Sequence, residues 1–313
     1  MATTVKWLPY GRQDVHEDDI AAVVEVLRSD WLTTGPAVPA FEKAVAETVG
    51  AAEAVAVSSG TAALHAAYAA LGLGPGDEVI VPAITFAATS NAALYLGATP
   101  VFADVDAKTL LLDPADTERK ITPRTRAIVA VDYAGQPCDY DALRALARSH
   151  GLLLVADACH SLGAAFRGRP VGALADLTAF SFHPVKTITT GEGGMVTTDD
   201  PDRARWMRAF RNHGITTDHR ERAESGTVSY DMVLLGYNYR LTDFQAALGM
   251  AQLRRLSSVL EQRRRLADIY YRGLSDLAYV RPLLTAADRT HAHHILVVRL
   301  ETGRLRQSRD EVV

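Results

Sequence analysis

The segment that decides the fold is Ala179 to Thr198, AFSFHPVKTITTGEGGMVTT, in which one lysine stands between two short strand-like stretches. The stretch before it, Leu177 to Phe182, and the stretch after it, Met195 to Thr198, predict strands joined by a glycine-rich turn. A lysine held between two strands aims its amine at one point, and a partly desolvated amine is a good nucleophile toward a carbonyl. Lys186 is therefore either a Schiff-base lysine or an ordinary solvated lysine of a hairpin, and the rest of the chain decides between them.

Length and composition place limits on the protein. The chain has 313 residues, of which 48% are hydrophobic, and its net charge is -4, which predicts one large domain plus part of a second. The near balance of charge provides no basic surface for nucleic acid. With only Cys138 and Cys159 and no CxxC pair, we expect neither a disulfide framework nor a zinc site. No apolar run approaches the ~20 residues of a membrane span, so we expect a cytoplasmic protein without membrane contact.

The N-terminal region predicts two helices separated by a loop. The first covers Asp14 to Ser29, with Asp14 and Glu17 as a capping box, and the second covers about Pro39 to Val49. The loop between them, Asp30 to Pro36, carries hydroxyl groups and one aromatic ring.

The middle of the chain alternates strands with helices. Helices are predicted at Thr61 to Leu71 and Tyr140 to Ser149. The apolar runs of strand length are Ala54 to Val57, Val79 to Val81, Val101 to Ala103, Ala127 to Val131 and Leu152 to Ala156. Short apolar strands between helices indicate a mostly parallel sheet covered on both faces, with ligands at the carboxyl ends of the strands.

The C-terminal part predicts the start of a second domain. Thr242 and Gln245 form a capping box for a long helix that runs to about Leu274. Strands are then expected at Tyr279 to Leu284 and at His294 to Leu300. We place the large domain at residues 1–252 and an incomplete small α/β domain at residues 253–313.

Small residues follow the first predicted strand, in the order Ser58-Ser59-Gly60-Thr61-Ala62. They open a helix whose free N–H groups can bind a phosphate, assisted by the helix dipole. The alternative is a plain helix cap formed by Ser59 or Thr61. The chain contains neither GxGxxG at this point nor a GxxxxGK[ST] motif, so dinucleotide and P-loop interpretations lack their fingerprints.

Other candidate residues follow the later strands. Phe86, after the second strand, presents an aromatic ring near the sheet edge or is a core phenylalanine. Asp157 ends an apolar strand, where a carboxylate is costly unless an arginine, a metal or a pyridinium nitrogen meets it. His160 is a candidate for the same site or a core histidine.

One ligand satisfies these features together. Its phosphate suits Gly60, Thr61 and Ser181, and its aromatic ring suits Phe86. Its protonated ring nitrogen suits Asp157 and its aldehyde suits Lys186. That ligand is pyridoxal 5'-phosphate (PLP).

The chain resembles the DegT/StrS family of nucleotide-sugar aminotransferases from Tyr10 to its last residue. The most specific motif is FSFHPVKTITTGEGG, supported by SSGTAAL, DACHSLGA and GYNYRLTDFQAALG. The resemblance implies the aspartate-aminotransferase fold, PLP fold type I, with a mostly parallel seven-stranded sheet and helices on both faces. It also implies that the family's relatives continue for several dozen residues past position 313.

The resemblance implies a role for each matching residue. Lys186 holds the cofactor as a Schiff base and Asp157 pairs with the pyridinium. Asn238 reaches the phosphate in the neighbouring subunit, so a homodimer is needed for activity. The remaining implied contacts are Gly60, Thr61, Ala62 and Ser181 around the phosphate, Phe86 stacked on the ring, and His160 beside Asp157.

Within the family, the N-terminal segment and the lysine motif are most similar to the UDP-4-amino-4,6-dideoxy-N-acetyl-β-L-altrosamine transaminases of pseudaminic acid biosynthesis. This similarity implies transfer of an amine from L-glutamate to the C4 ketone of a UDP-linked 4-keto-6-deoxy-N-acetylhexosamine. That branch often has alanine where this chain has Gly60. The residues implied at the nucleotide-sugar site are Tyr10, Asp30, Trp31, Leu32 and Thr33.

Several alternatives stay open on the sequence. The substrate could be another nucleotide-linked keto sugar, dTDP-linked or with its ketone at C3 or C4. Family members that dehydrate sugars carry histidine at the lysine position, so Lys186 favours transamination. A non-catalytic PLP-binding regulator would keep the same site. A cofactor-free Schiff-base aldolase would leave the placement of Asp157, Gly60 and Thr61 unexplained.

Overall fold

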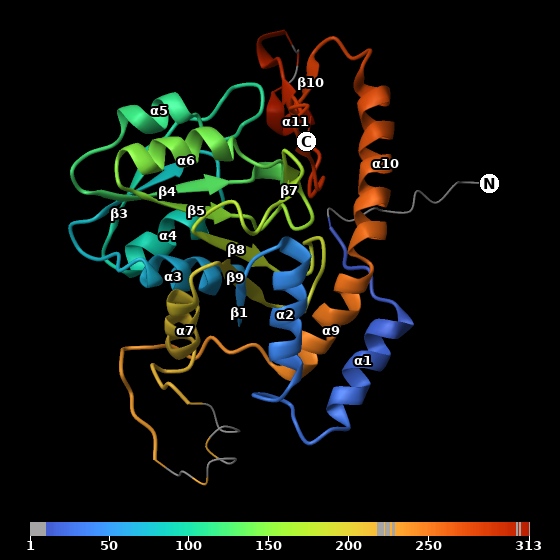
Figure 1. Cartoon of the computed structure of the whole chain (residues 1–313). Helices are drawn as coiled ribbons and strands as arrows, with labels where there is room; N and C mark the ends of the chain where they lie inside the picture. Colours follow the sequence, from blue (N-terminus) through green and yellow to red (C-terminus); the bar gives the residue numbers. More distant parts are fainter. Residues whose placement is uncertain are drawn as a thin grey trace.

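A seven-stranded sheet forms the centre of the protein in a computed structural model, which describes residues 11–217, 222, 226, 229–304, 306 and 308–312 (Figure 1). From one edge to the other, the strands are β1 (Glu53–Val57), β9 (Gly194–Thr198), β8 (Leu177–Ser181), β5 (Leu153–Asp157), β4 (Thr125–Val131), β2 (Glu78–Pro82) and β3 (Thr99–Ala103). The five strands from β3 to β8 are parallel to one another, which confirms the predicted sheet.

Strand β9 is the exception, because it runs antiparallel to both of its neighbours, β1 and β8. Ser181 at the end of β8 pairs with Gly194 at the start of β9. The loop between these strands therefore leaves the sheet at its carboxyl edge and returns at the same edge. This loop carries Lys186.

Helices cover both faces of the sheet, as predicted (Figure 1). Alternate residues of one strand enter different cores: Leu154 and Ala156 pack on one face, and Val155 packs on the other. The first face is covered by α2 (Ala37–Val49) and α6 (Tyr140–Ser149), and the second by α3 (Gly60–Ala70), α4 (Ala87–Tyr95) and α7 (Pro201–Phe210). Strands buried on both faces must be apolar throughout, which explains the sequence pattern.

The first helix begins differently from its prediction. Helix α1 covers Glu17–Leu27, and its capping box joins His16 and Asp19 instead of Asp14 and Glu17. The carboxylate of Asp19 accepts a hydrogen bond from the His16 N–H at 2.9 Å. It also accepts two hydrogen bonds from the guanidinium of Arg255, at 2.9 and 2.8 Å. This long-range ion pair buries Asp19 and fixes the helix start, and no local pattern could reveal it.

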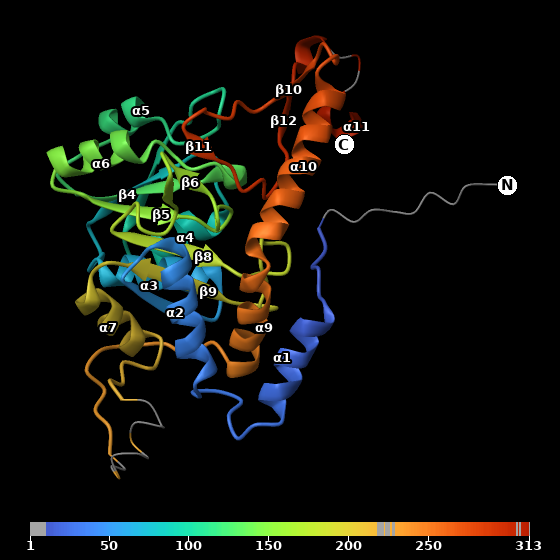
Figure 2. The ribbon, with the colours of Figure 1, turned by 45° about the vertical axis from the view of Figure 1, so that its right-hand side comes forward.

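The long C-terminal helix is two helices. The capping box of Thr242 and Gln245 is confirmed at the start of α9 (Asp243–Arg254). The helical dihedrals are interrupted at Arg255, with φ -101° and ψ 3°, and α10 (Leu256–Leu274) follows. Figure 2 shows α10 extending away from the sheet toward β10 (Val280–Pro282). In the described part of the chain, no helix combines the length and apolar character needed to cross a membrane.

The remaining elements are short. Strand β10 pairs with β12 (Val298–Leu300), so both predicted C-terminal strands are shorter than expected. The others are α5 (Pro114–Arg119), η1 (Tyr133–Gly135), β6 (Ala165–Phe166), β7 (Arg169–Pro170), β11 (Arg289–Thr290), η2 (Thr302–Arg304) and α11 (Arg309–Val312).

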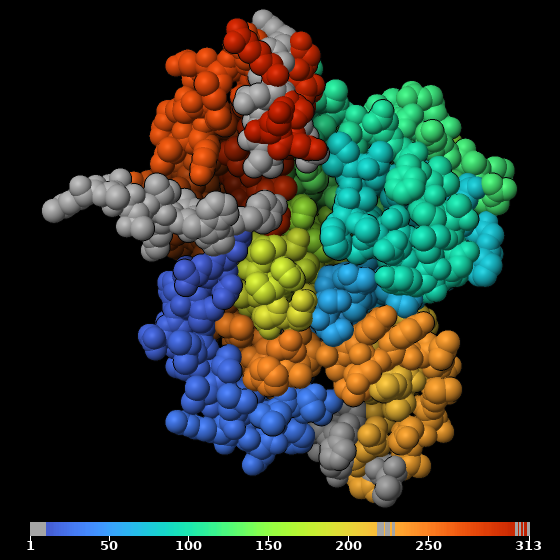
Figure 3. Space-filling model, turned by 180° about the vertical axis from the view of Figure 1, so that it is seen from behind, coloured from blue at the N-terminus to red at the C-terminus, as the bar shows by residue number. Residues whose placement is uncertain are grey.

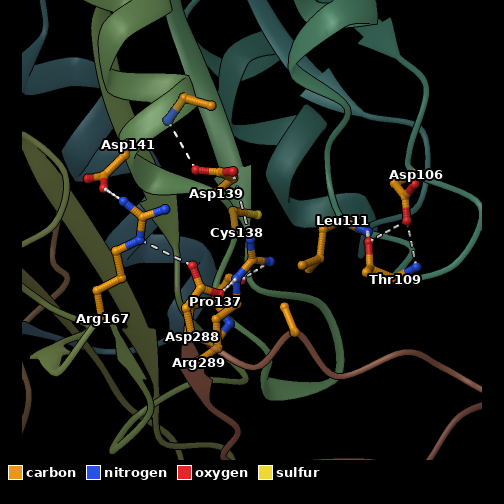
Figure 4. Close-up of polar contacts among 12 residues, drawn as sticks. Asp106, Thr109, Leu111, Pro137, Cys138, Asp139, Asp141, Arg167, Asp288 and Arg289 are labelled. Atoms are coloured by element: carbon orange, nitrogen blue, oxygen red, sulfur yellow. Dashed lines mark hydrogen bonds and ion pairs between the residues drawn. The ribbon is translucent and has the colours of Figure 1, made fainter.

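The segment around β11 returns from the C-terminal part to the large domain, where β11 pairs with β6 in a separate three-stranded sheet, β11-β6-β7 (Figure 4). Arg167 binds Asp141 at 2.6 Å and Asp288 at 3.2 Å. The guanidinium of Arg289 donates to the carbonyl oxygen of Pro137 at 3.0 Å. These contacts fix the chain just before His294, whose N–H donates to the carbonyl of Ala134 at 2.9 Å. A late segment of the sequence is thereby attached to the carboxyl edge of the sheet.

Candidate functional site

A cavity of about 880 Å³ lies at the carboxyl edge of the sheet. Segments distant in the sequence meet on the face seen in Figure 3, where the yellow-green part of the chain lies between blue, cyan and red parts. Seven of the predicted site residues line this cavity: Gly60, Thr61, Phe86, Asp157, His160, Ser181 and Lys186.

The predicted reactive amine is that of Lys186, which lies in the loop between β8 and β9 and lines the cavity. The loop is held by its own backbone, since the Lys186 N–H donates to the His183 carbonyl at 2.9 Å and the Thr190 N–H to the Phe182 carbonyl at 3.0 Å. Burial lowers the pKa of the Lys186 amine below its ordinary value, while Cys159 and Asp157 act in the opposite direction. A lowered pKa increases the neutral, nucleophilic fraction of the amine.

Asp157 ends β5 and is 6% exposed. One carboxylate oxygen accepts a hydrogen bond from the hydroxyl of Thr89 at 2.6 Å, and the other accepts one from the Cys159 N–H at 3.3 Å. No ion pair to Asp157 is found among the residues that the structure describes. A buried carboxylate without a cation of the described protein at ion-pair distance suits a ligand that carries a positive charge, such as a pyridinium nitrogen.

The predicted phosphate cradle corresponds to the start of α3. Ser59 is the N-cap, and its hydroxyl accepts the N–H of Ala62 at 3.1 Å. A Cβ added at Gly60 would lie 2.7 Å from the Cβ of Ser181, so only glycine allows this close approach. The N–H groups of Gly60 and Thr61 belong to the first turn, where the helix provides no acceptor. They can bind an anion with assistance from the dipole of α3.

This geometry combines the two interpretations that the sequence left open. Ser59 does cap the helix, and the first N–H groups still remain for a phosphate. Ala62 is buried and its N–H is already bonded to Ser59, so its predicted contact with the phosphate stays a prediction.

Aromatic rings surround the cavity. Phe86 is the N-cap residue of α4 and is 73% exposed, so it is no core phenylalanine. Burial and the charge of Lys186 lower the pKa of His160 to about 4, which keeps its imidazole neutral at physiological pH. The rings of His160 and His294 lie 4.3 Å apart, and that of Tyr133 lies 6.3 Å from His160.

Sequence reasoning missed Thr89, Tyr133 and His294. Thr89 lies one helical turn after Phe86, a spacing that could have placed both at the sheet edge. His294 belongs to the histidine-rich segment HAHH, which is recognisable in the sequence, but nothing in the sequence indicates which part of the fold this segment contacts. Tyr133 had no signal beyond its position after a strand.

Other predicted residues lie away from this cavity. Among its described lining residues, none comes from the segment 30–33 and none is Asn238. Thr33 forms an isolated bridge with Thr242, and Asn238 forms one with Asn212. Tyr10 lies outside the described residues. The roles predicted for Asp30, Trp31, Leu32 and Asn238 stay predictions.

The residues present fit PLP. Gly60 leaves room beside Ser181, Asp157 provides a buried carboxylate, and Lys186 provides an amine of lowered pKa in the same cavity. When bound, PLP supplies an electron sink for the negative charge that develops on an amino donor's α-carbon. This site, on a sheet of this topology, defines a PLP-dependent transaminase of fold type I.

The chain belongs to the DegT/DnrJ/EryC1/StrS aminotransferase family, whose sequence profile matches residues 13–313. It is 41% identical over 308 residues to the spore coat polysaccharide biosynthesis protein SpsC of Bacillus subtilis, covering 98% of this chain and 79% of that protein.

Solved structures agree with this assignment. Spr1654 of Streptococcus pneumoniae, a candidate sugar aminotransferase in its PMP form, is 34% identical with a TM-score of 0.90, covering 94% of this chain and 79% of that one. PseC of Helicobacter pylori, an aminotransferase of pseudaminic acid biosynthesis, is 33% identical with a TM-score of 0.89, covering 95% and 79%. The protein is therefore a PLP-dependent sugar aminotransferase by family and by fold.

Proposed function

We propose that this protein transfers the amino group of L-glutamate to the C4 ketone of a UDP-linked 4-keto-6-deoxy-N-acetylhexosamine. The observation that carries the transamination is the joint presence of Lys186 and Asp157 in one cavity at the carboxyl edge of the sheet. The similarity to PseC supports this sugar, since that aminotransferase acts in the biosynthesis of pseudaminic acid.

Each residue would then have one task. The Lys186 amine would hold the cofactor and would also be the base that accepts a proton from the α-carbon of the amino donor. The Asp157 carboxylate keeps a proton on the pyridine nitrogen. The other cofactor contacts are Gly60, Thr61, Ala62 and Ser181 at the phosphate, Phe86 against the ring, and His160 beside Asp157.

The nucleotide sugar would be bound by residues from outside this cavity. We assign this role to Tyr10, Asp30, Trp31, Leu32 and Thr33. The assignment rests on the resemblance to the family. The described residues of this group do not line the cavity of their own subunit. Their role is tested by the KM for the nucleotide sugar, which should be higher in Trp31→Ala than in the wild type.

A homodimer would complete the site, with Asn238 reaching the phosphate held by the partner subunit. Exposed apolar side chains just before Asn238 support a subunit contact there: Tyr230, Met232, Val233 and Leu235. Mass photometry of the purified protein tests this proposal.

The predicted domain boundary and location remain proposals. The interruption of the helix at Arg255 supports a large domain of residues 1–252 followed by a small one. A cytoplasmic location stays a prediction from the sequence.

A second candidate is the amination of another nucleotide-linked keto sugar. The identity to SpsC, 41%, exceeds the 33% to PseC. Gly60 also favours this alternative, because the altrosamine branch often has alanine there and a Cβ at this position would meet Ser181.

The deciding experiment offers L-glutamate and a panel of UDP- and dTDP-linked 3-keto and 4-keto sugars, and measures product masses. The expected product is the 4-amino sugar from the UDP-linked 4-keto-N-acetylhexosamine. Formation of product only from a dTDP-linked sugar would replace the proposed substrate with the alternative. Lys186→Ala is the control, and it should form no product from any sugar.

A further inference from the structure

One guanidinium joins the two segments that form the wall around the reactive amine. Arg263, on α10, donates from one nitrogen to the carbonyl oxygens of His293 at 3.2 Å and His294 at 3.0 Å. Its other terminal nitrogen donates to the carbonyl oxygen of Lys186 at 3.5 Å. The acceptors are therefore backbone groups separated in sequence by about a hundred residues and brought together by a single side chain.

The surroundings of Arg263 differ from those of an arginine that stabilises a fold by ion pairing. Burial lowers its pKa below the ordinary value, and no carboxylate of the described residues lies within ion-pair distance. Arg255, at the start of the same helix, instead binds the buried carboxylate of Asp19 through two hydrogen bonds. Arg263 is partly buried and lines a neighbouring cavity, and its printed side-chain hydrogen bonds all go to backbone carbonyl oxygens.

The segments that Arg263 joins both carry groups that line the cavity. One carries the amine of Lys186, and the other carries the ring of His294. The His294 ring packs against the His160 ring at 4.3 Å and 30°. The Nδ1 atoms of both histidines are buried without a hydrogen-bond partner in the described structure, so these atoms do not fix the orientation of the rings.

We propose that Arg263 is a positioning residue for transamination: it fixes the Lys186 loop relative to the His294–His160 pair, and so fixes where the reactive amine points. The proposal rests on the role of Lys186 in the proposed function. Among the residues that the structure describes, the backbone N–H of Lys186 donates to the His183 carbonyl of its own loop, and its carbonyl accepts from Arg263. Helix α10 thereby connects the C-terminal part of the chain to the chemistry.

Three variants test this proposal in the cofactor-bound protein. Arg263→Gln removes the fork of donors and the charge. Arg263→Lys keeps the charge but loses the planar guanidinium, because the three N–H donors of an ammonium all sit on one nitrogen and do not reach carbonyls as far apart. Arg265→Gln removes an exposed charge two residues further along α10 and is the matched control.

The readouts separate positioning from mere stability. In Arg263→Gln, we expect the rate of the glutamate half-reaction per bound cofactor to fall by roughly 100-fold, as for a misplacement of about 1 Å. KM should change by less than about threefold, since substrate contacts remain. The visible circular dichroism per bound cofactor, which reports its orientation, should lose half its amplitude or more. Amide exchange should accelerate in residues 183–190 and 291–296.

Arg263→Lys should recover less than about a tenth of the lost rate, and Arg265→Gln should match the wild type. A lower melting temperature with unchanged rate and dichroism per bound cofactor would assign Arg263 a stability role only and overturn the proposal. If Arg263→Gln does not fold, the same comparison is made with Arg263→Lys. An inactive wild type would instead refute the proposed function.

Discussion

Two buried carboxylates, those of Asp157 and Asp132, lie at the carboxyl edge of the sheet at the ends of neighbouring strands. They differ in whether they line the cavity. Asp157 ends β5, where it pairs with Val131 at the end of β4. Asp132 is the next residue of that neighbouring chain segment, and its N–H donates to the Asp157 carbonyl at 3.1 Å. Both follow apolar strands, yet only Asp157 lines the cavity.

The difference is the face of the sheet that each side chain enters. Successive residues alternate, so Asp157 points to the side of α4 and meets Thr89, whereas Asp132 points to the side of α6. There Asp132 accepts hydrogen bonds from the hydroxyls of Ser161 at 2.7 Å and Tyr140 at 3.0 Å, and from the Cys138 N–H at 2.8 Å. Burial raises the pKa of Asp132 to about 7 despite these donors. Of these two carboxylates, Asp157 is therefore the one that a ligand in the cavity can reach.

The sharpest test of this comparison is Asp157→Asn. The amide cannot keep a proton on a pyridine nitrogen, so we expect the glutamate half-reaction to slow by roughly 1000-fold while the cofactor still binds. Stopped-flow absorbance measures the rate per bound cofactor. A rate within about threefold of the wild type would remove Asp157 from the mechanism.

The predicted phosphate site in the same cavity is tested by Gly60→Ala. The added Cβ meets the Ser181 Cβ at 2.7 Å, and overpacking of this kind costs about 1–3 kcal/mol. We expect cofactor affinity, measured by equilibrium dialysis, to fall by roughly 10- to 100-fold. Gly74→Ala is the control, because a Cβ there meets nothing within 4 Å. Equal affinities in both variants would show that the cradle tolerates a side chain.

The support of Asp157 is tested by Thr89→Val, which keeps the shape and removes the hydroxyl that donates at 2.6 Å. A hydrogen bond to a charged group contributes about 1.5–3 kcal/mol, so we expect the same half-reaction to slow by at least about tenfold. Thr85→Val should have a smaller effect, because Thr85 bonds to Thr89 and not to Asp157. The reverse order of effects would contradict this support.

The smallest effect on activity is expected for Asp132→Asn, within about threefold of the wild type because Asp132 does not line the cavity. Its effect is on stability. Folded Asp132 keeps its proton up to about pH 7, whereas an unfolded aspartate releases it near pH ~4.

The native state therefore holds more protons in this window, and the free energy of unfolding falls as the pH rises from about 4 to about 7, by up to about 4 kcal/mol. Asp132→Asn should flatten this decrease, as measured by urea unfolding at several pH values. A pH dependence identical to that of the wild type would show that Asp132 is not the titrating group.

Much of the fold could be predicted from the sequence. Strands buried on both faces must be apolar, and capping residues mark where helices begin. The range Tyr140–Ser149 and the Thr242 capping box are confirmed. The start of α1 and the interruption at Arg255 could not be predicted, since the ion pair between Asp19 and Arg255 joins residues far apart in the sequence.

The sequence by itself determined a mostly parallel α/β sheet and the candidate residues at its carboxyl edge. A lysine between two strands, an aspartate at the end of a strand and a helix that begins with glycine can each be recognised from neighbouring residues alone. The tertiary structure alone decided which aspartate faces the cavity, since Asp132 and Asp157 look alike in sequence and differ only in the face each enters. It alone also brought His294 and Arg263 to Lys186. Such contacts depend on how distant segments pack, and no local pattern records them.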